Sequence, residues 1–202
     1  MKKLIYILKN NITYLDLFAF VNAFLFLMMT IFVYYDRFIE YRGVANLHEF
    51  FFYASVIFTA IAYTWIKYRD LDVNISILVM IEITILIHFA GAFINIDGHR
   101  LYDFRLFDIR YDKFVHFTNS VIGCYVILYL FQKNGYEVTK FILAISVLST
   151  LGIGAIIEII EFIVTLSVKH NGVGGYNNNM FDLLANLLGG LSLVSYYLYR
   201  KK

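Results

Sequence analysis

Long, nearly uninterrupted apolar runs constrain this chain more than any other feature of its sequence. A helix that crosses a membrane needs about 20 mostly apolar residues, and six stretches of the 202-residue chain qualify. They cover residues 14–35, 48–66, 74–95, 114–131, 141–168 and 180–199. Transmembrane strands would instead alternate apolar and polar residues in segments of about ten. The sequence therefore predicts an all-α polytopic integral membrane bundle with six transmembrane helices.

The composition agrees with a membrane protein and argues against a nucleic-acid-binding protein. Hydrophobic residues make up 60% of the chain, against about 45–50% in soluble domains. The formal net charge of +2 is too small to indicate a nucleic-acid partner. No cleavable signal peptide is evident and no linker divides the chain, so we expect a single integral membrane domain over residues 1–202. The single cysteine, Cys124, lies in an apolar run, which predicts a thiol packed in the core.

The distribution of lysine and arginine predicts the orientation of the bundle. With six spans both termini lie on one side, and that side carries ten of the 17 basic residues. Cytoplasmic segments carry the excess of positive charge in membrane proteins. We therefore expect a multi-pass protein of the cell membrane with both termini in the cytoplasm. The 97–111 loop, with three arginines on the opposite side, runs against this bias.

Polar residues form one stripe on each of the last four predicted helices. Spacings of three, four and seven residues place the members of a stripe on one helix face. Neighbouring helices run in opposite directions, yet at about 1.5 Å per residue the ionisable members all fall in the half of the membrane opposite the termini. Ionisable groups inside a membrane usually mark function, so we predict one polar cluster that opens to the extracytoplasmic side. The stripes are His88, Gly91 and Asn95; Asp112, His116, Asn119 and Gly123; Gly154, Glu158, Glu161 and Thr165; and Asn179, Asp182, Asn186 and Gly189.

Two imidazoles and four carboxylates in this cluster permit three kinds of chemistry. Imidazole with carboxylate suits zinc, manganese or iron(II). Paired glutamates permit metal-free acid–base catalysis, and the same residue types relay protons. The expected catalytic residues are Glu158, Glu161, Asp112 and His116, the expected substrate-binding residues are Asp182, Asn186 and Asn119, and the candidate ligands of a divalent metal are His88, Asp112, His116, Glu161 and Asp182.

The same residues also have purely structural explanations. Asp112 and Asp182 could stabilise the beginnings of their helices, where negative charge is favourable. One of the glutamates could pair with Lys113 or Arg110 and serve only helix packing. His88 could be a hydrogen-bonded core residue with no ligand.

Two loops on the predicted outer side carry weaker signals. The stretch "DGHRLYDFRLFDIR" mixes aromatic and charged residues, which predicts a short hairpin with its arginines near lipid phosphates. The stretch "HNGVGGYNNN", residues 170–179, is glycine-rich without phosphate-loop spacing, and we expect a mobile loop over the cluster. Asp16 and Glu82 belong to no stripe, and we place Asp16 near the cytoplasmic interface.

Three short motifs occur in an order that resembles a known group. The motifs "YDKFVHF" (111–117), "EIIEF" (158–162) and "FDLLANLLGG" (181–190) are similar to those of the VanZ-like superfamily of small multi-pass membrane proteins. The form of "EIIEF" and the upstream "HFAG" (88–91) look closer to the YjdF-type bacterial membrane proteins. The resemblance covers residues 85–195 and implies that the following residues occupy family motif positions: Asp112, His116, Glu158, Glu161, Asp182 and Asn186.

The chain also departs from both patterns. VanZ-type members usually carry glutamine where this chain has Glu161. YjdF-type members carry a further acidic residue where this chain has asparagines 177–179.

These observations favour an enzyme, or an enzyme-like binder, that acts on a lipid or an envelope-linked substrate at the outer leaflet. Membrane lipids are its expected partners. Two other classes stay open. A proton-coupled transporter would need a polar path through the cytoplasmic half, where there is little besides Asp16 and Glu82. A non-catalytic scaffold would use the polar network only to fix helix packing.

Overall fold

The computed structural model describes residues 12–167 and 175–200, and most of these are helical. Six segments within the described ranges are long and apolar enough to cross a membrane, which confirms the predicted all-α membrane fold. The elements in chain order are α2 (Tyr14–Met29), η1 (Thr30–Tyr34), α3 (Tyr35–Arg42), η2 (Val44–Asn46), α4 (Leu47–Tyr68), α5 (Ile75–Phe93), β1 (Asn95–Ile96), β2 (His99–Arg100), η3 (Leu101–Asp103), β3 (Arg105–Leu106), β4 (Ile109–Arg110), α6 (Tyr111–Lys133), α7 (Lys140–Ser167) and α8 (Tyr176–Arg200).

The chain forms two compact units, residues 1–82 and 83–202. We call them the N-terminal unit and the C-terminal unit, and each is described by itself. Helix α5 begins in the first unit and ends in the second. The expectation of a single domain stays a prediction.

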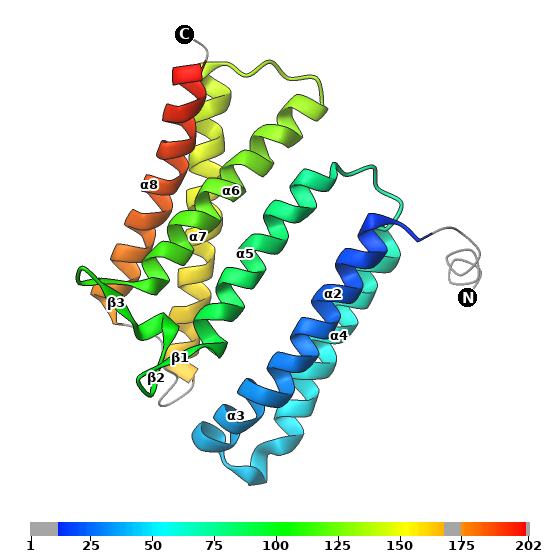
Figure 1. Ribbon diagram of the computed structural model, residues 1–202, viewed down its shortest axis with the longest axis vertical. Helices are drawn as coiled ribbons and strands as arrows, with labels where there is room; N and C mark the ends of the chain where they lie inside the picture. Colours follow the sequence, from blue (N-terminus) through cyan, green and yellow to red (C-terminus); the bar gives the residue numbers. More distant parts are fainter. Residues whose placement is uncertain (1–11, 168–174, 201–202) are drawn as a thin grey trace. The chain divides into compact units, whose positions relative to one another are not determined.

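In the N-terminal unit, α2 and α4 lie side by side (Figure 1). A buried ion pair joins the beginning of α2 to the end of α4. Thr13 and Asp16 form a capping box that starts α2 by satisfying two free backbone N–H groups. The Asp16 carboxylate also accepts hydrogen bonds from the Arg69 guanidinium at 2.5 and 2.8 Å. The indole N–H of Trp65 donates to the same carboxylate at 2.7 Å. Asp16 therefore links α2 to α4.

Two further polar features of α2 lie deeper in the same unit. The Asn22 side-chain amide donates to the Glu82 carboxylate at 2.7 Å. This contact supplies a partner for Glu82, which belongs to no stripe. At its other end α2 passes into the π-helical turn η1, where the Thr30 hydroxyl donates to the Phe26 carbonyl at 2.7 Å.

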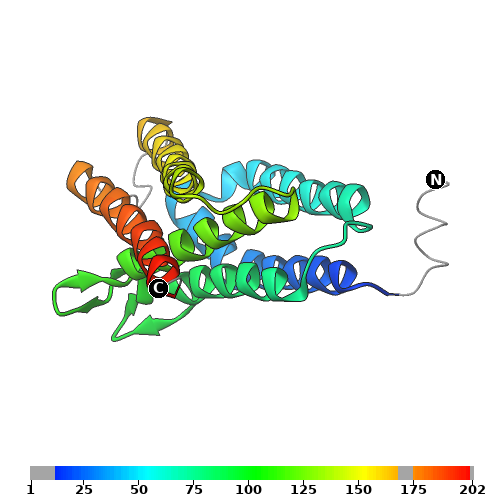
Figure 2. The same ribbon diagram turned by 90° about the horizontal axis from the view of Figure 1, so that it is seen from above.

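Helices α6, α7 and α8 pack against one another to form the core of the C-terminal unit (Figures 1 and 2). Helices α6 and α8 come especially close at Gly189, because a Cβ atom there would meet the backbone oxygen of Phe117. Small residues allow this close approach between membrane helices. Toward the end of α6 and the beginning of α7, the space between the helices is filled by an apolar cluster: Leu128, Ile142, Leu143, Phe131, Val138, Leu193, Val194 and Tyr197.

Two short β-hairpins connect α5 to α6, where the sequence predicted one. Asp97 and Gly98 form the first turn with φ of 51° and 81°, as a two-residue type I′ hairpin turn requires. Phe107 and Asp108 form the second turn with φ of 50° and 62°. Both hairpins lie at the end of the C-terminal unit where α6 and α8 begin (Figures 1 and 2). They are therefore placed beside the polar ends of these helices.

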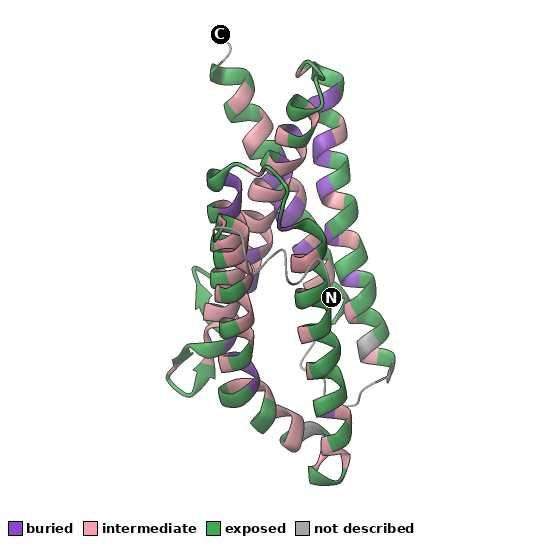
Figure 3. Ribbon diagram, turned by 90° about the vertical axis from the view of Figure 1, so that its right-hand side faces the viewer, coloured by how far each residue is buried: buried purple, intermediate pink, exposed green. Residues whose placement is uncertain are grey.

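Most side chains on the helices are exposed or partly exposed, and buried positions are a minority (Figure 3). The exposed set includes large apolar residues such as Phe20, Phe51 and Leu148. Apolar outer faces are what helices surrounded by lipid require, because lipid chains are as apolar as leucine. Polar residues dominate the fully buried positions instead, with Ser120, Ser146 and Asp182 nearly inaccessible.

Candidate functional site

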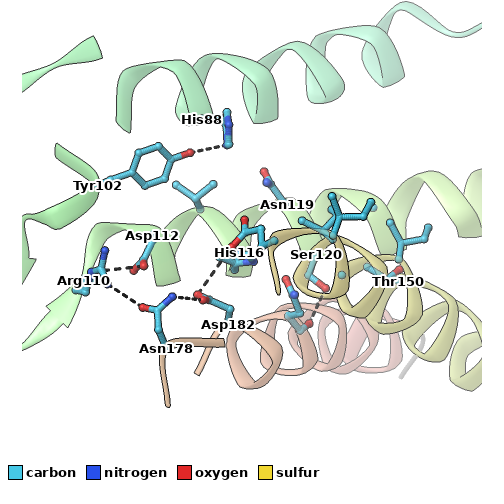
Figure 4. Close-up of a pocket in the computed structure, with 18 of the residues that line it drawn as sticks. His88, Tyr102, Arg110, Asp112, His116, Asn119, Ser120, Thr150, Asn178 and Asp182 are labelled. Atoms are coloured by element: carbon cyan, nitrogen blue, oxygen red, sulfur yellow. Dashed lines mark hydrogen bonds and ion pairs between the residues drawn. The ribbon is translucent and has the colours of Figure 1, made fainter. Parts of the chain in front are cut away.

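A cavity of about 410 Å³ lies in the C-terminal unit, between the end of α5, the hairpin segment and helices α6 to α8. Polar side chains from all of these elements reach it (Figure 4). Its lining comprises His88, Arg100, Tyr102, Arg110, Asp112, Val115, His116, Asn119, Ser120, Gly123, Thr150, Ile153, Gly154, Ile157, Ile160, Glu161, Asn178, Asp182 and Asn186.

His116, Glu158 and Asp182 form the centre of the site, one residue from each of α6, α7 and α8. His116 Nε2 lies 3.4 Å from Asp182 Oδ1 and 3.8 Å from Glu158 Oε1. One donor atom from each residue lies within 4.8 Å of the other two. Figure 4 shows His116 and Asp182 turned toward each other. Neither carboxylate oxygen of Glu158 has a hydrogen-bond partner among the described residues, although the side chain is buried.

Lys113 holds the first turns of α6 and α8 together. Its ammonium group donates to Asp182 Oδ1 at 2.6 Å and to the Asn178 side chain at 2.8 Å. It also lies 3.2 Å from Asp112 Oδ2. The Asn178 amide donates in turn to Asp182 Oδ2 at 2.8 Å. Each oxygen of Asp182 thus has a protein partner, and its Oδ1 faces both Lys113 and His116.

The hairpin segment supplies a second group of charges at the edge of the cavity. Arg110 donates to Asp103 at 3.0 Å and to the Asn178 side chain at 2.9 Å, and its Nε lies 3.5 Å from Asp112. Arg100 donates to Asp103 at 2.8 Å. Arg100 and Arg110 line the cavity, whereas the sequence placed the loop arginines near lipid phosphates. Arg110 thus ties the hairpin segment to the beginning of α6 by an ion pair and to the beginning of α8 by a hydrogen bond.

His88 lies on the α5 side of the cavity, where its Nδ1 and the Tyr102 hydroxyl are 2.5 Å apart. The two rings also make an edge-to-face contact (Figure 4). The Tyr111 hydroxyl donates to the Ile87 carbonyl at 3.1 Å and fixes α6 to this part of α5. His88 is therefore a hydrogen-bonded residue of the wall, separate from the central three.

The deeper wall is polar but incompletely paired. Asn119 Oδ1 and Asn186 Nδ2 are buried and have no hydrogen-bond partner in the described part of the chain. The Ser120 hydroxyl donates to the Asn186 carbonyl at 2.5 Å, which joins α6 to α8. Gly154 leaves room for the Asn186 side chain against α7. Buried polar atoms are costly when unpaired, so these two amides are available to a bound molecule.

The predicted site residues occupy two positions relative to the cavity. Glu158 does not line the cavity itself but lies next to His116, which does. The residues that line the cavity itself are His88, Asp112, His116, Asn119, Glu161, Asp182 and Asn186. The roles assigned to all eight stay predictions.

Two of the structural explanations do not fit the observed helices. Helix α8 begins at Tyr176, so Asp182 lies beyond its first turn and cannot act as a helix-start residue. Lys113 pairs with Asp112 and Asp182, and Arg110 pairs with Asp103 and Asp112, rather than with a glutamate. Asp112 does lie in the first turn of α6, but no side chain caps that helix. The loop over residues 170–179 is described only from residue 175, and its remaining part lies outside the described residues.

Several residues of the site were not predicted as members, among them Lys113, Asn178 and Tyr102. Lys113 precedes His116 by three positions, and Asn178 precedes Asp182 by four, so helical spacing could have found both. Tyr102 reaches His88 from the loop, and no sequence period links the two.

A family of membrane proteins matches the chain over most of its length. The family described as "Predicted membrane protein (DUF2238)" matches residues 17–202, a range that contains every residue of the site. No curated protein and no solved structure matches the chain. The six candidate spans agree with that description. This chain belongs to the DUF2238 family of predicted membrane proteins.

Proposed function

We propose that this protein is a membrane enzyme, or an enzyme-like binder, that acts on a lipid or an envelope-linked substrate. The observation that carries the proposal is the convergence of His116, Glu158 and Asp182 from three helices beside one cavity. Ionisable residues at membrane depth are expensive and usually functional. Three of them brought together beside a cavity are more than helix packing requires.

The lining of the cavity suits an amphipathic molecule. Helix α7 contributes three exposed apolar side chains to the lining, Ile153, Ile157 and Ile160, together with Glu161. The sides formed by α6 and α8 carry Asp112, Asp182, the His116 imidazole and the side-chain amides of Asn119 and Asn186. A lipid has the same division, with acyl chains next to a polar head group. We therefore place the head group at the polar side and the chains along α7.

Each polar group can be given a role in such a reaction. Glu158 and Glu161 serve as the acid–base pair, since carboxyl groups in apolar surroundings can both accept and donate protons. His116 and Asp112 orient and polarise the reacting group. Asn119, Asn186 and Asp182 bind the head group by hydrogen bonds. Asn119 and Asn186 are suited to this because each has an unpaired buried atom.

The positive-charge bias of the loops supports an orientation with both termini in the cytoplasm of a cell-membrane protein. The site then faces the extracytoplasmic side and the outer leaflet. As part of the same proposal, we suggest that this chain is related to VanZ-like and YjdF-type proteins, because its three motifs are similar to theirs.

The far end of the cavity argues against a transporter. The lining reaches no deeper than Gly123 and Thr150. Beyond these residues Leu128, Ile142 and Leu143 form the core of an apolar cluster. A transported ion or solute would have to cross this cluster, whereas a lipid substrate needs access from one end only.

The test compares lipid extracts from bacteria that express the wild type, Glu158→Gln or Glu137→Gln. Glu137 is an exposed loop residue and provides the matched control. We expect the wild type and Glu137→Gln to change the abundance of at least one lipid or lipid-linked precursor, measured by mass spectrometry. Glu158→Gln should reduce the rate of that change by roughly 100-fold or more, the usual contribution of a general acid–base group.

Two results would count against the proposal. Extracts of wild-type and Glu158→Gln cells that do not differ, with both proteins folded, would remove the acid–base role. In a scaffold, the change in lipid abundance would fall in Glu158→Gln and Glu161→Gln only as far as the amount of folded protein falls.

A further inference from the structure

We infer that His116 Nε2, Glu158 and Asp182 Oδ1 hold one divalent transition-metal ion of the zinc, manganese or iron(II) class. The inference rests on the proposed function for what the ion is used for, and on geometry alone for its existence. With Glu158 bound to the ion, Glu161 alone serves as the acid–base group. It selects three ligands, one from each of α6, α7 and α8. In residues 12–167 and 175–200, these three form the one group whose donor atoms lie this close together.

The distances within the group fit a shared ion better than direct hydrogen bonds. The separations of 3.4 Å and 3.8 Å from His116 Nε2 exceed the usual N–H···O range of about 2.7–3.2 Å. Two ligands that each lie about 2.1 Å from a tetrahedral zinc ion are themselves about 3.4 Å apart. Small shifts of the side chains would therefore complete the coordination of an ion.

The state of Glu158 is an independent sign that something is bound. Its side chain is 5% exposed, and neither of its oxygens has a hydrogen-bond partner among the described residues. A buried carboxylate without partners is costly. Its Oε1 is directed toward His116 Nε2, at the place where an ion would lie. A metal ion would satisfy this carboxylate without any further change of the fold.

The balance of charge around the cavity also favours a divalent cation. With every group ionised and the histidines neutral, five carboxylates face three basic side chains, which leaves a surplus of two negative charges. A divalent ion cancels this surplus. The groups counted are Asp103, Asp112, Glu158, Glu161 and Asp182 against Arg100, Arg110 and Lys113.

The donor atoms select the class of metal. One imidazole with two carboxylates suits zinc, manganese and iron(II), and the imidazole disfavours magnesium and calcium, which prefer oxygen alone. Three protein ligands leave a coordination position for water or substrate, as in catalytic zinc sites. The predicted ligands outside this group have other surroundings: His88 contacts Tyr102, Asp112 contacts Lys113, and Glu161 lines the cavity.

Lys113 competes with the ion for Asp182. Its ammonium group lies 2.6 Å from Asp182 Oδ1, the oxygen that faces His116. When the ion binds, the ammonium can stay with Asp112 and Asn178, which it already contacts. Because like charges at this distance repel, removal of the ammonium should strengthen metal binding.

The test measures bound metal in the full chain purified in detergent. The wild type is incubated with Zn²⁺ or Mn²⁺, desalted and analysed by elemental mass spectrometry. We expect one ion per chain, and a loss of at least 100-fold in affinity in His116→Ala and in Glu158→Gln. The exposed His99 belongs to neither the cavity nor the group, so His99→Ala should keep the ion.

A second variant, Lys113→Met, is expected to gain affinity for the ion, a result that misfolding would not produce. Lys113→Met should bind Zn²⁺ about tenfold more tightly than the wild type, while Lys140→Met at the start of α7 should not differ. Added Zn²⁺ should raise the melting temperature of the wild type and leave that of Glu158→Gln unchanged.

Three results would overturn the inference: no ion in folded wild type after loading, an ion retained in both ligand variants, or weaker binding in Lys113→Met. If metal-free wild type still changed the abundance of lipids, the proposed function would hold and only the inference of a bound ion would be wrong.

Discussion

Replacing Arg69 by methionine is expected to destabilise the N-terminal unit by about 3–5 kcal/mol. The guanidinium donates two hydrogen bonds to Asp16, at 2.5 and 2.8 Å. The side chains of Arg69 and Asp16 are 2% and 15% exposed. Without the arginine, the carboxylate stays in a largely buried place with its charge uncompensated, which typically costs this amount.

Trp65 provides the measurement, because it is the single tryptophan and donates to the same carboxylate at 2.7 Å. Its fluorescence can follow unfolding in mixed micelles of increasing denaturing detergent. Arg42→Met is the matched control. The Arg42–Glu49 pair is equally short at 2.8 Å but 38% and 27% exposed, so its loss should cost about 0–1 kcal/mol. Equal losses at the two arginines would contradict the prediction.

Gly189→Ala is expected to destabilise the C-terminal unit by about 3 kcal/mol, at the upper end of the usual cost of overpacking. The new Cβ would meet the backbone oxygen of Phe117 and lie 3.0 Å from the Ser120 Cβ. A backbone atom inside a helix cannot turn away as a side chain can. Helices α6 and α8 would have to move apart, and the spacing between His116 and Asp182 would change with them.

The single cysteine reports on this change. Cys124 is fully buried on α6, so a thiol-reactive dye labels it only when the helices separate. We expect Gly189→Ala to be labelled at a lower temperature than the wild type. Gly152→Ala on α7 is the control, because nothing lies within 4 Å of its Cβ position. Equal labelling temperatures for the two variants would show that the α6–α8 contact tolerates a methyl group.

The membrane fold could be predicted from the sequence because long apolar runs admit few structures. The polar ends of the helices were harder to predict. Helices α6 and α8 begin at Tyr111 and Tyr176, three and four residues earlier than expected. These first turns contain Lys113 and Asn178, whose polar side chains bond to each other. An average of hydropathy along the chain assigns such polar residues to loops, because it contains no information about a partner on another helix.

The candidate site was predictable as far as helical spacing reaches. Stripes on single helices and a shared depth were enough to name His116, Glu158 and Asp182 as neighbours in one region, and the structure places them within 4.8 Å. Contacts between segments that are far apart in the sequence cannot be predicted from helical spacing. Tyr102 with His88 and Asp16 with Arg69 are of this kind, because the partners are 14 and 53 residues apart.

The ion pair between Lys113 and Asp182 joins residues that are 69 positions apart. Helix α6 is therefore synthesised before α8 exists, with Lys113 in its first turn. Asp112, 3.2 Å from the ammonium, gives α6 a counter-charge of its own during this interval. Asp182 then arrives with the last helix of the described chain. The ion pair between α6 and α8 can thus form only once α8 has been made, so this part of the site is completed late in biosynthesis.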